Sequence, residues 1–113
     1  MAQPQFLDDP AFRCLRTGDL DGFRKQLAGR SAVDLSGSDL RGADLRGLDL
    51  TKVQLRGSYL RDADLRGVDL QHVDMEGCSL YHAKISGAYF PTNVSAAEIS
   101  MSVQFGTRMR CEE

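Results

Sequence analysis

The side chains most suited to catalysis or metal binding in this sequence are two histidines and three cysteines. His72 and His82 have no third metal ligand and no orienting carboxylate at a matching position. Cys14, Cys78 and Cys111 are an odd number at wide spacings without a C-x-x-C pair, which argues against a zinc site and against disulfides. No nucleophile, base and orienting group can be assembled from these residues. We therefore expect a protein that is not an enzyme and that holds no cofactor and no metal.

Aspartates recur at a fixed place, immediately before a large apolar residue. A regular row of carboxylates could hold a metal ion or imitate phosphates, but a short Asp side chain next to a turn also accepts hydrogen bonds from nearby backbone amides. The local hydrogen bond explains the recurrence without a ligand, so we favour it. The seven residues are Asp34, Asp39, Asp44, Asp49, Asp64, Asp69 and Asp74.

Arginines follow the same apolar residues and form, with two tyrosines, a candidate protein-binding face. Arg and Tyr are enriched at protein interfaces and often dominate their binding energy. Asp39, Asp44 and Asp64 lie close by in the sequence, so the alternative is a solvated surface of charges that screen one another. The candidate residues of this face are Arg41, Arg46, Tyr59, Arg61, Arg66 and Tyr81.

These residues recur because residues 33–92 divide without a gap into twelve units of five. The third place of each unit is large and apolar, and the first place is small in every unit except the one that begins with Leu48. Both places must face a core, whereas the last place is Gly in seven units, where a turn can require a positive φ. The third-place residues are Leu35, Leu40, Leu45, Leu50, Leu55, Leu60, Leu65, Leu70, Met75, Leu80, Ile85 and Phe90.

A period of five fits neither an amphipathic helix nor a plain strand. In an α-helix five steps of about 100° would scatter successive leucines around the axis. In a strand an odd period would send them to opposite faces. The remaining solution is a chain that turns a corner every five residues and keeps the same residue inside.

The units Ala43–Gly47 and Ala63–Gly67, both A-D-L-R-G, resemble those of the pentapeptide-repeat proteins. The resemblance implies a mainly β fold, a right-handed quadrilateral β-helix with four units to a coil. Residues 33–92 then form about three coils, and residues twenty apart lie over one another. With strands stacked about 4.8 Å apart, the body is only roughly 14 Å tall.

Residues 9–29 are predicted to form a helical hairpin that caps the first coil. Asp9-Pro10 is a good helix start, Gly18 interrupts the helix, and a second helix fits from about Asp19 to Ala28, with Gly29 as its end.

Residues 93–113 are predicted to cap the third coil or to join two subunits in a homodimer. Ser95 and Glu98 form a capping box whose Glu can return a hydrogen bond to the Ser backbone, and Gly106 can end a helix. The strict alternation of apolar and polar residues over 99–105 is a strand signature instead. We favour the helix because both of its end signals are present, and we favour the cap because a helix would end strand pairing. The candidate contacts are Phe90, Ile99, Met101, Val103, Phe105 and Met109.

We treat the 113 residues as a single domain with a formal net charge of −2, and they contain no basic patch typical of nucleic-acid binding. No signal peptide and no membrane span are recognisable, so we expect a cytoplasmic protein. The favoured function is a non-enzymatic scaffold or adaptor for a protein partner, either as a monomer or as a homodimer through the C-terminal segment.

The alternative function is a DNA mimic that modulates a type II topoisomerase such as DNA gyrase, as some members of the resembled family do. Two observations weigh against it. The body matches only about four base pairs of duplex, and residues 33–92 carry nine acidic and seven basic side chains, whereas DNA presents an unbroken row of phosphates.

Overall fold

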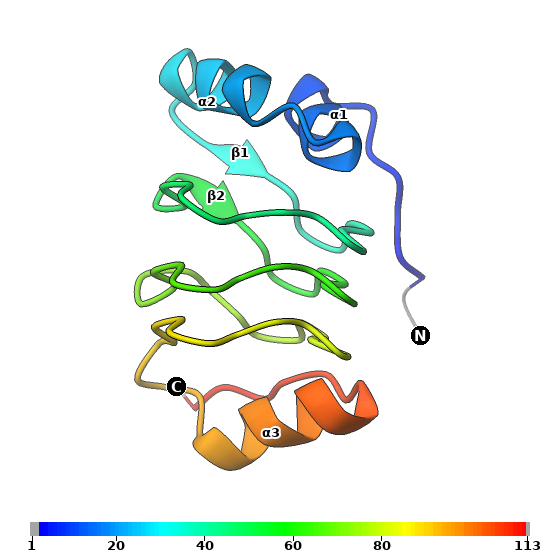
Figure 1. Ribbon diagram of the computed structural model, residues 1–113, viewed down its shortest axis with the longest axis vertical. Helices are drawn as coiled ribbons and strands as arrows, with labels where there is room; N and C mark the ends of the chain where they lie inside the picture. Colours follow the sequence, from blue (N-terminus) through cyan, green and yellow to red (C-terminus); the bar gives the residue numbers. More distant parts are fainter. Residues whose placement is uncertain (1–2, 113) are drawn as a thin grey trace.

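The computed structural model describes residues 3–112, which form a stack of coils between two helical ends (Figure 1). Helices α1 (Pro10–Thr17) and α2 (Leu20–Ala28) cover one end, and α3 (Ala96–Phe105) covers the other. The body between them contains two short parallel strands, β1 (Val33–Asp34) and β2 (Val53–Gln54). None of the helices between residues 3 and 112 has the length and apolar composition needed to cross a membrane.

Each coil of the body takes twenty residues. Val33 pairs with Val53, and single parallel bridges join Asp44 to Asp64 and Asp69 to Tyr89, always twenty positions along the chain. Four five-residue sides therefore complete one turn, as the repeat predicts. We name the sides A, B, C and D after their first-coil units, 33–37, 38–42, 43–47 and 48–52.

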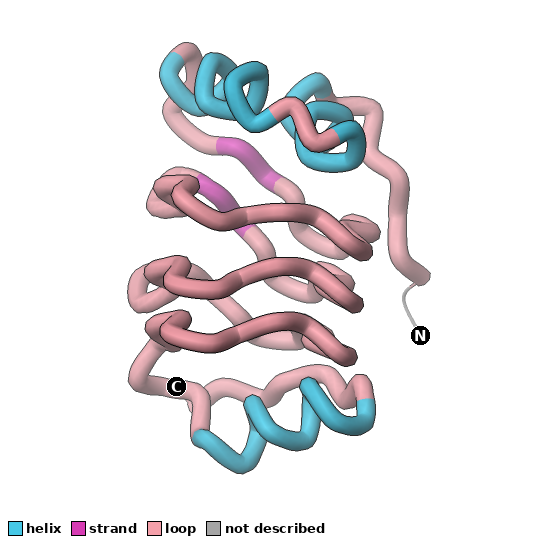
Figure 2. The backbone as a smooth tube through the Cα atoms, viewed as in Figure 1, coloured by secondary structure: helices cyan, strands magenta, loops and turns pink. Residues whose placement is uncertain are grey.

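The expectation of a mainly β fold holds only in part. Figure 2 shows most of the body as loop, with two strands of two residues each. The reason is the corner every five residues, which interrupts each ladder after one or two pairs. The last residue of each unit on sides A, B and C has a positive φ. This residue is Gly except in two units of side B, where Asp62 and His82 adopt the same conformation. Side D turns without a positive φ at Lys52 or His72, which explains why Gly is missing there.

The core consists of the predicted columns. The third-place residues from Leu35 to Leu80 are at most 2% exposed, and those twenty apart stack along the axis. Ile85 and Phe90 are only partly buried, although they pack against the core. They belong to sides C and D of the last coil, where no further coil follows.

The N-terminal helical pair forms as predicted. Asp9 caps α1 by accepting a hydrogen bond from the Ala11 amide, and its carboxylate also binds both terminal nitrogens of Arg30 at 2.8 and 3.0 Å. Phe12 and Phe23 are buried at the first coil. Gln5 adds one more parallel bridge, to Ser38, and thereby extends side B upward.

The C-terminal segment is helical, which confirms the helix and excludes the strand. Ser95 caps α3 by accepting from the Glu98 amide, and Gly106 ends the helix in the left-handed conformation. The predicted return bond from Glu98 to Ser95 is wrong. The Glu98 carboxylate instead accepts from the backbone and guanidinium of Arg110, because the chain reverses after Gly106 and brings Arg110 beside the helix.

This reversal covers the third coil with its own chain. The Met109 carbonyl accepts from the Gly77 amide, the Met109 amide donates to the Cys78 carbonyl, and Val103 accepts from the His82 amide. Met109 is fully buried. Residues 103–109 thus supply hydrogen-bond partners that a fourth coil would otherwise provide on sides A and B.

Candidate functional site

Side B carries a groove that runs along the helix axis. Asp39, Tyr59 and Ser79 occupy successive rungs of this side and are joined by parallel bridges. The fourth-place residues of the same units, Arg41, Arg61 and Tyr81, also line the groove, whose volume is about 520 Å³. Its ends come from outside the repeats, from Gln3 and Pro4 at one end and from Phe105 and Gly106 at the other.

Tyr81 and Arg61 form one wall of this groove. The Arg61 guanidinium lies 5.0 Å from the centroid of the Tyr81 ring, a cation–π contact. The His82 ring also stacks on the Tyr81 ring, with 3.9 Å between the ring centroids. Gly106 is packed under the tyrosine, so that a Cβ there would lie 3.4 Å from ring atoms of Tyr81. The φ of +75° is the reason that this position favours glycine.

Tyr59 is held by the returning C-terminal segment. The Arg108 guanidinium lies 4.7 Å from the Tyr59 ring centroid and donates a hydrogen bond to the Gly77 carbonyl at 3.2 Å. Arg108 belongs to no five-residue unit, so the repeat register gave no signal for it. Phe105 was predicted only as a cap or dimer contact, and the structure places it at the groove as well.

Arg41 is positioned by a buried carboxylate. Asp39 is 4% exposed and accepts hydrogen bonds from the amide and the Nε of Arg41 at 3.1 and 3.2 Å. Arg16 of α1 approaches the same carboxylate at 4.0 Å and donates to the Arg41 carbonyl at 3.0 Å. The charge of Asp39 is therefore balanced locally by two arginines, one of which lines the groove.

The structure separates the other two predicted arginines from this groove. Arg46 and Arg66 lie on side C, where Arg46 contacts Asp44 at 3.0 Å and Asp64 at 3.2 Å, and Arg66 contacts Asp64 at 2.7 Å. The hydrogen bond from Arg66, opposed by burial and helped by backbone bonding, lowers the pKa of Asp64 to about 2. Side C therefore carries a set of charges that neutralise one another, the alternative to a binding face.

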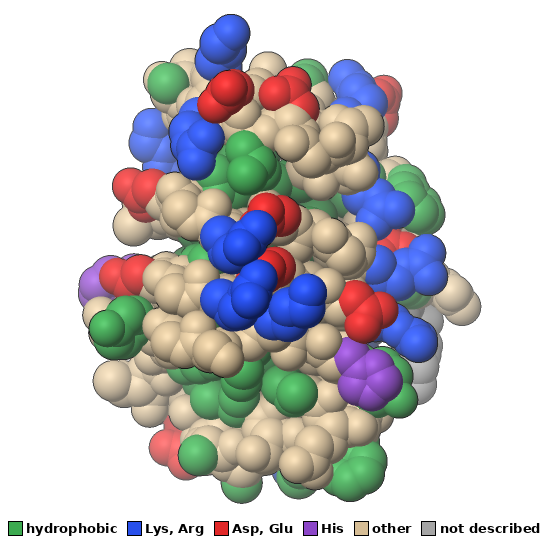
Figure 3. All heavy atoms as spheres, viewed as in Figure 1, with side chains coloured by type: hydrophobic (Ala, Val, Ile, Leu, Met, Phe, Trp, Pro, Cys, Tyr) green, Lys and Arg blue, Asp and Glu red, His purple; other side chains and the backbone are tan. Residues whose placement is uncertain are grey.

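Figure 3 shows one group of basic side chains near the middle of this face, beside acidic ones, and further basic side chains toward the upper end and along the right edge. The seven recurrent aspartates use their carboxylates as predicted. Each accepts a hydrogen bond from the amide two residues further on, at 2.9 to 3.2 Å. They are turn-stabilising groups, and among residues 3–112 no group of three or more His, Cys, Asp or Glu side chains is placed to hold a metal ion.

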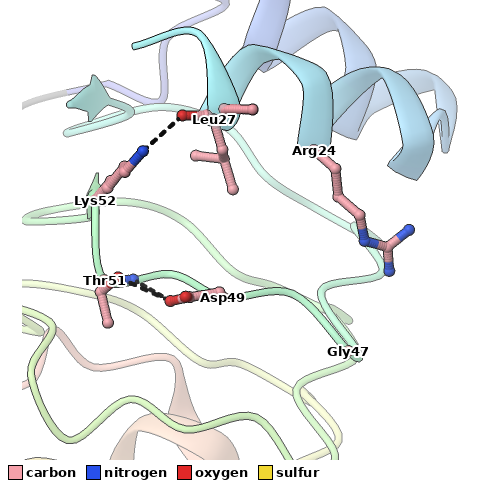
Figure 4. A pocket seen from close by; sticks show the side chains of 7 residues that line it. Arg24, Leu27, Gly47, Asp49, Thr51 and Lys52 are labelled. Atoms are coloured by element: carbon pink, nitrogen blue, oxygen red, sulfur yellow. Dashed lines mark hydrogen bonds between the residues drawn. The ribbon is translucent and has the colours of Figure 1, made fainter. Parts of the chain in front are cut away.

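A second hollow, of about 300 Å³, lies between α2 and the first coil (Figure 4). The Lys52 ammonium crosses it and donates to the carbonyls of Leu27 and Arg30 at 2.9 and 3.2 Å. Asp49 accepts from both the amide and the hydroxyl of Thr51. The Lys52 hydrogen bonds join the end of α2 to the first coil, whereas the Asp49–Thr51 bonds lie within the coil, so this hollow is a structural joint.

The cysteines in the body and tail are poor nucleophiles. Burial raises the pKa of the Cys78 thiol, which also hydrogen-bonds the Leu55 carbonyl at 3.0 Å. Burial and the neighbouring Glu76 carboxylate raise the pKa of Cys111 to about 11. Both are therefore protonated at neutral pH and unsuited to covalent catalysis.

The candidate contacts of the C-terminal segment divide into an inner and an outer set. Met109 is buried, while Phe90, Ile99 and Val103 are partly buried against the core. Met101 and Phe105 point outward, and Phe105 is 72% exposed. The only charged residue of α3 is Glu98, which Arg110 pairs.

The stacked twenty-residue coils, closed by helices at both ends, define a short repeat solenoid. The family model for pentapeptide repeats matches eight copies of the repeat, over residues 31–67 and 58–91, and the chain belongs to that family. The family implies a β-helix, in agreement with the coil period described above. No curated protein and no solved structure matches the chain.

Proposed function

We propose that this protein is a non-enzymatic, cytoplasmic scaffold that binds a protein partner through the side B groove. The observation that carries the proposal is the groove itself, which places Tyr59, Tyr81 and Phe105 beside Arg41 and Arg61 on a fixed backbone. Aromatic residues and arginine are the side chains that most often dominate protein interfaces. The proposal includes the right-handed, four-sided, three-coil geometry that the family resemblance implies.

Rigidity supports this function. Coil stacking fixes Tyr59 and Tyr81, while Arg108 and Gly106 pack directly against their rings. Because these side chains are already ordered, a partner that docks on them loses little of its binding energy to ordering the groove. The raised pKa values of Cys78 and Cys111 and the locally paired carboxylates support a role without catalysis.

The DNA-mimic alternative finds less support in the positions of the carboxylates. A mimic of DNA needs an outward row of unpaired negative charges. On sides B and C, however, Asp39, Asp44 and Asp64 are paired with arginines, and on side A Asp74 is paired with Arg56 at 3.1 Å.

The test of the proposed function is affinity purification with matched tyrosine variants. Wild-type protein, Tyr81→Ala and Tyr89→Ala are immobilised and exposed to a lysate of the source cells, and the retained proteins are identified by mass spectrometry. Tyr89 is the control because it is 60% exposed but lies on side D. A specific partner should be retained by wild type and Tyr89→Ala and lost from Tyr81→Ala. A partner that all three retain equally would contradict binding through the groove.

We propose further that, where two copies associate, they do so through the outer face of α3. The chain supplies the hydrogen-bond partners for sides A and B of its own third coil, so a second copy is not needed to pair them. A two-fold contact places a surface against itself, which favours an uncharged surface such as that of Met101 and Phe105. Figure 3 shows mainly uncharged and hydrophobic side chains at this end. Light scattering of wild type and Met101→Glu distinguishes monomer from dimer, and a dimer that persists in Met101→Glu would exclude this face.

A further inference from the structure

We infer that the side B groove recognises an acidic, extended segment of its partner, with apolar residues among the acidic ones. This inference rests on the proposed function and names the chemistry of the partner.

The charge around the groove is opposite to that of the whole chain. Arg41 and Arg61 line it, and Arg16 and Arg108 adjoin it through their contacts with Arg41 and Tyr59. The carboxylate that lines it, Asp39, is nearly inaccessible and already paired with Arg41. The chain as a whole nevertheless has a formal net charge of −2, so an acidic partner is attracted to this groove more than to the rest of the surface.

Arg61 is the residue best placed to bind a carboxylate. Its side chain is 55% exposed, and its nearest carboxylate, that of Asp62, is 3.7 Å away and itself largely exposed. Within residues 3–112 the Arg61 guanidinium makes no hydrogen bond. The Arg61 guanidinium lies 5.0 Å from the Tyr81 ring centroid, and its N–H donors can make the two-pronged contact that arginine forms with carboxylates.

The rest of the groove favours apolar side chains between the acidic ones. The ring of Tyr81, which lies against Arg61, and the exposed ring of Phe105 both line the groove. The backbone edges of side B are occupied, because Gln5 pairs with Ser38 and Arg108 pairs with Ser79. A partner segment therefore cannot join side B as a further strand and has to be held by side chains along the groove.

The experiment is selection of a random peptide library, displayed on phage, against the immobilised full chain. Selected peptides should be enriched in Asp and Glu. One of them, labelled with fluorescein, is then titrated by fluorescence polarisation with wild type, Arg61→Glu and Arg56→Glu. Arg56 occupies the same place of the preceding unit on side A and is 65% exposed, so it controls for charge and folding.

Arg61→Glu should weaken binding by about tenfold or more, and Arg56→Glu by less than about twofold, because Arg61 lines the groove and Arg56 lies on side A. Added NaCl should weaken binding to wild type. Circular dichroism establishes that both variants are folded.

Three results would overturn the inference: no enriched peptides, enriched peptides without acidic residues, or equal losses in the two variants. Displacement of the peptide by a fluorescence-silent single-stranded oligonucleotide of twenty nucleotides, at similar concentration, would also overturn it in favour of nucleic acid. If the lysate partner depends on Tyr81 while the peptides are not acidic, only this inference fails and the scaffold function stands.

Discussion

Replacing one core leucine in the middle coil tests whether the stacked columns stabilise the fold. Leu65 is fully buried on side C, with Leu45 in the coil before it and Ile85 in the coil after it. Ile85 occupies the same column but is only partly buried, because no further coil covers it. Leu65→Ala and Ile85→Ala therefore form a matched pair in one column.

The expected cost follows from what each substitution removes. Leu65→Ala removes about three methylene equivalents at about 0.8 kcal/mol each and leaves a cavity between two fixed coils, about 3 to 4 kcal/mol in total. Ile85→Ala should cost about 1 to 2 kcal/mol, because part of that side chain already contacts water and the site can relax. With about 4 °C per kcal/mol for a domain of this size, Leu65→Ala should melt roughly 12 to 16 °C below wild type.

The assay is urea unfolding followed by circular dichroism, with thermal melts of the same proteins. The free energy of unfolding should fall by about 1 to 3 kcal/mol more for Leu65→Ala than for Ile85→Ala. Equal losses in the two variants, or a larger loss in Ile85→Ala, would refute the inside-outside register and the idea that the last coil is less well covered.

Three further predictions follow from the charges, the tail and the thiols. Asp64, with its pKa lowered to about 2, stabilises the folded state above its unfolded pKa of 3.8 and loses this contribution as the pH falls from about 4 to about 2. The difference in urea midpoint between wild type and Asp64→Asn should therefore be larger at pH 7 than at pH 2.5, and a constant difference would contradict this. Deleting residues 95–113 should cause aggregation or a lower melting temperature, because Met109 and its hydrogen bonds are removed, whereas a soluble truncated monomer of unchanged stability would show that the tail is no cap. Alkylation of Cys111 by iodoacetamide, followed by mass spectrometry, should rise with pH up to about 11, and a plateau near pH 8.5 would contradict the raised pKa.

The body could be predicted from sequence because its core is periodic in the sequence itself. A residue such as Leu65 is inside since every third place is inside, and its neighbours at Leu45 and Ile85 follow from the twenty-residue coil. The aspartate hydrogen bonds were predictable for the same reason, because they join residues two positions apart. The helix ends at Asp9 and Ser95 were local signals of the same kind.

Contacts between the repeats and the ends could not be predicted in this way. The pairing of Glu98 with Arg110 replaced the expected capping box because the chain turns back after Gly106, and no local pattern encodes that turn's direction. The sequence also did not predict that four of the six face residues line the side B groove while the other two lie on side C. Arg46 and Arg66 occupy the same place in their units as Arg41 and Arg61, but on side C they share the carboxylates of Asp44 and Asp64, whereas Arg61 on side B lies against the Tyr81 ring.

The groove depends on the ends of the chain as much as on its repeats. Side B alone is a flat ladder, and the repeat makes sides A and C equally flat. What distinguishes side B is that Gln3 and Pro4 lie across its upper end, Phe105 and Gly106 lie across its lower end, and Arg108 covers Tyr59. The segments that stop the coils from adding further strands thus also form the ends of the side B groove. A longer solenoid would stretch side B without closing it, so the short length of this β-helix is itself part of how the binding surface is built.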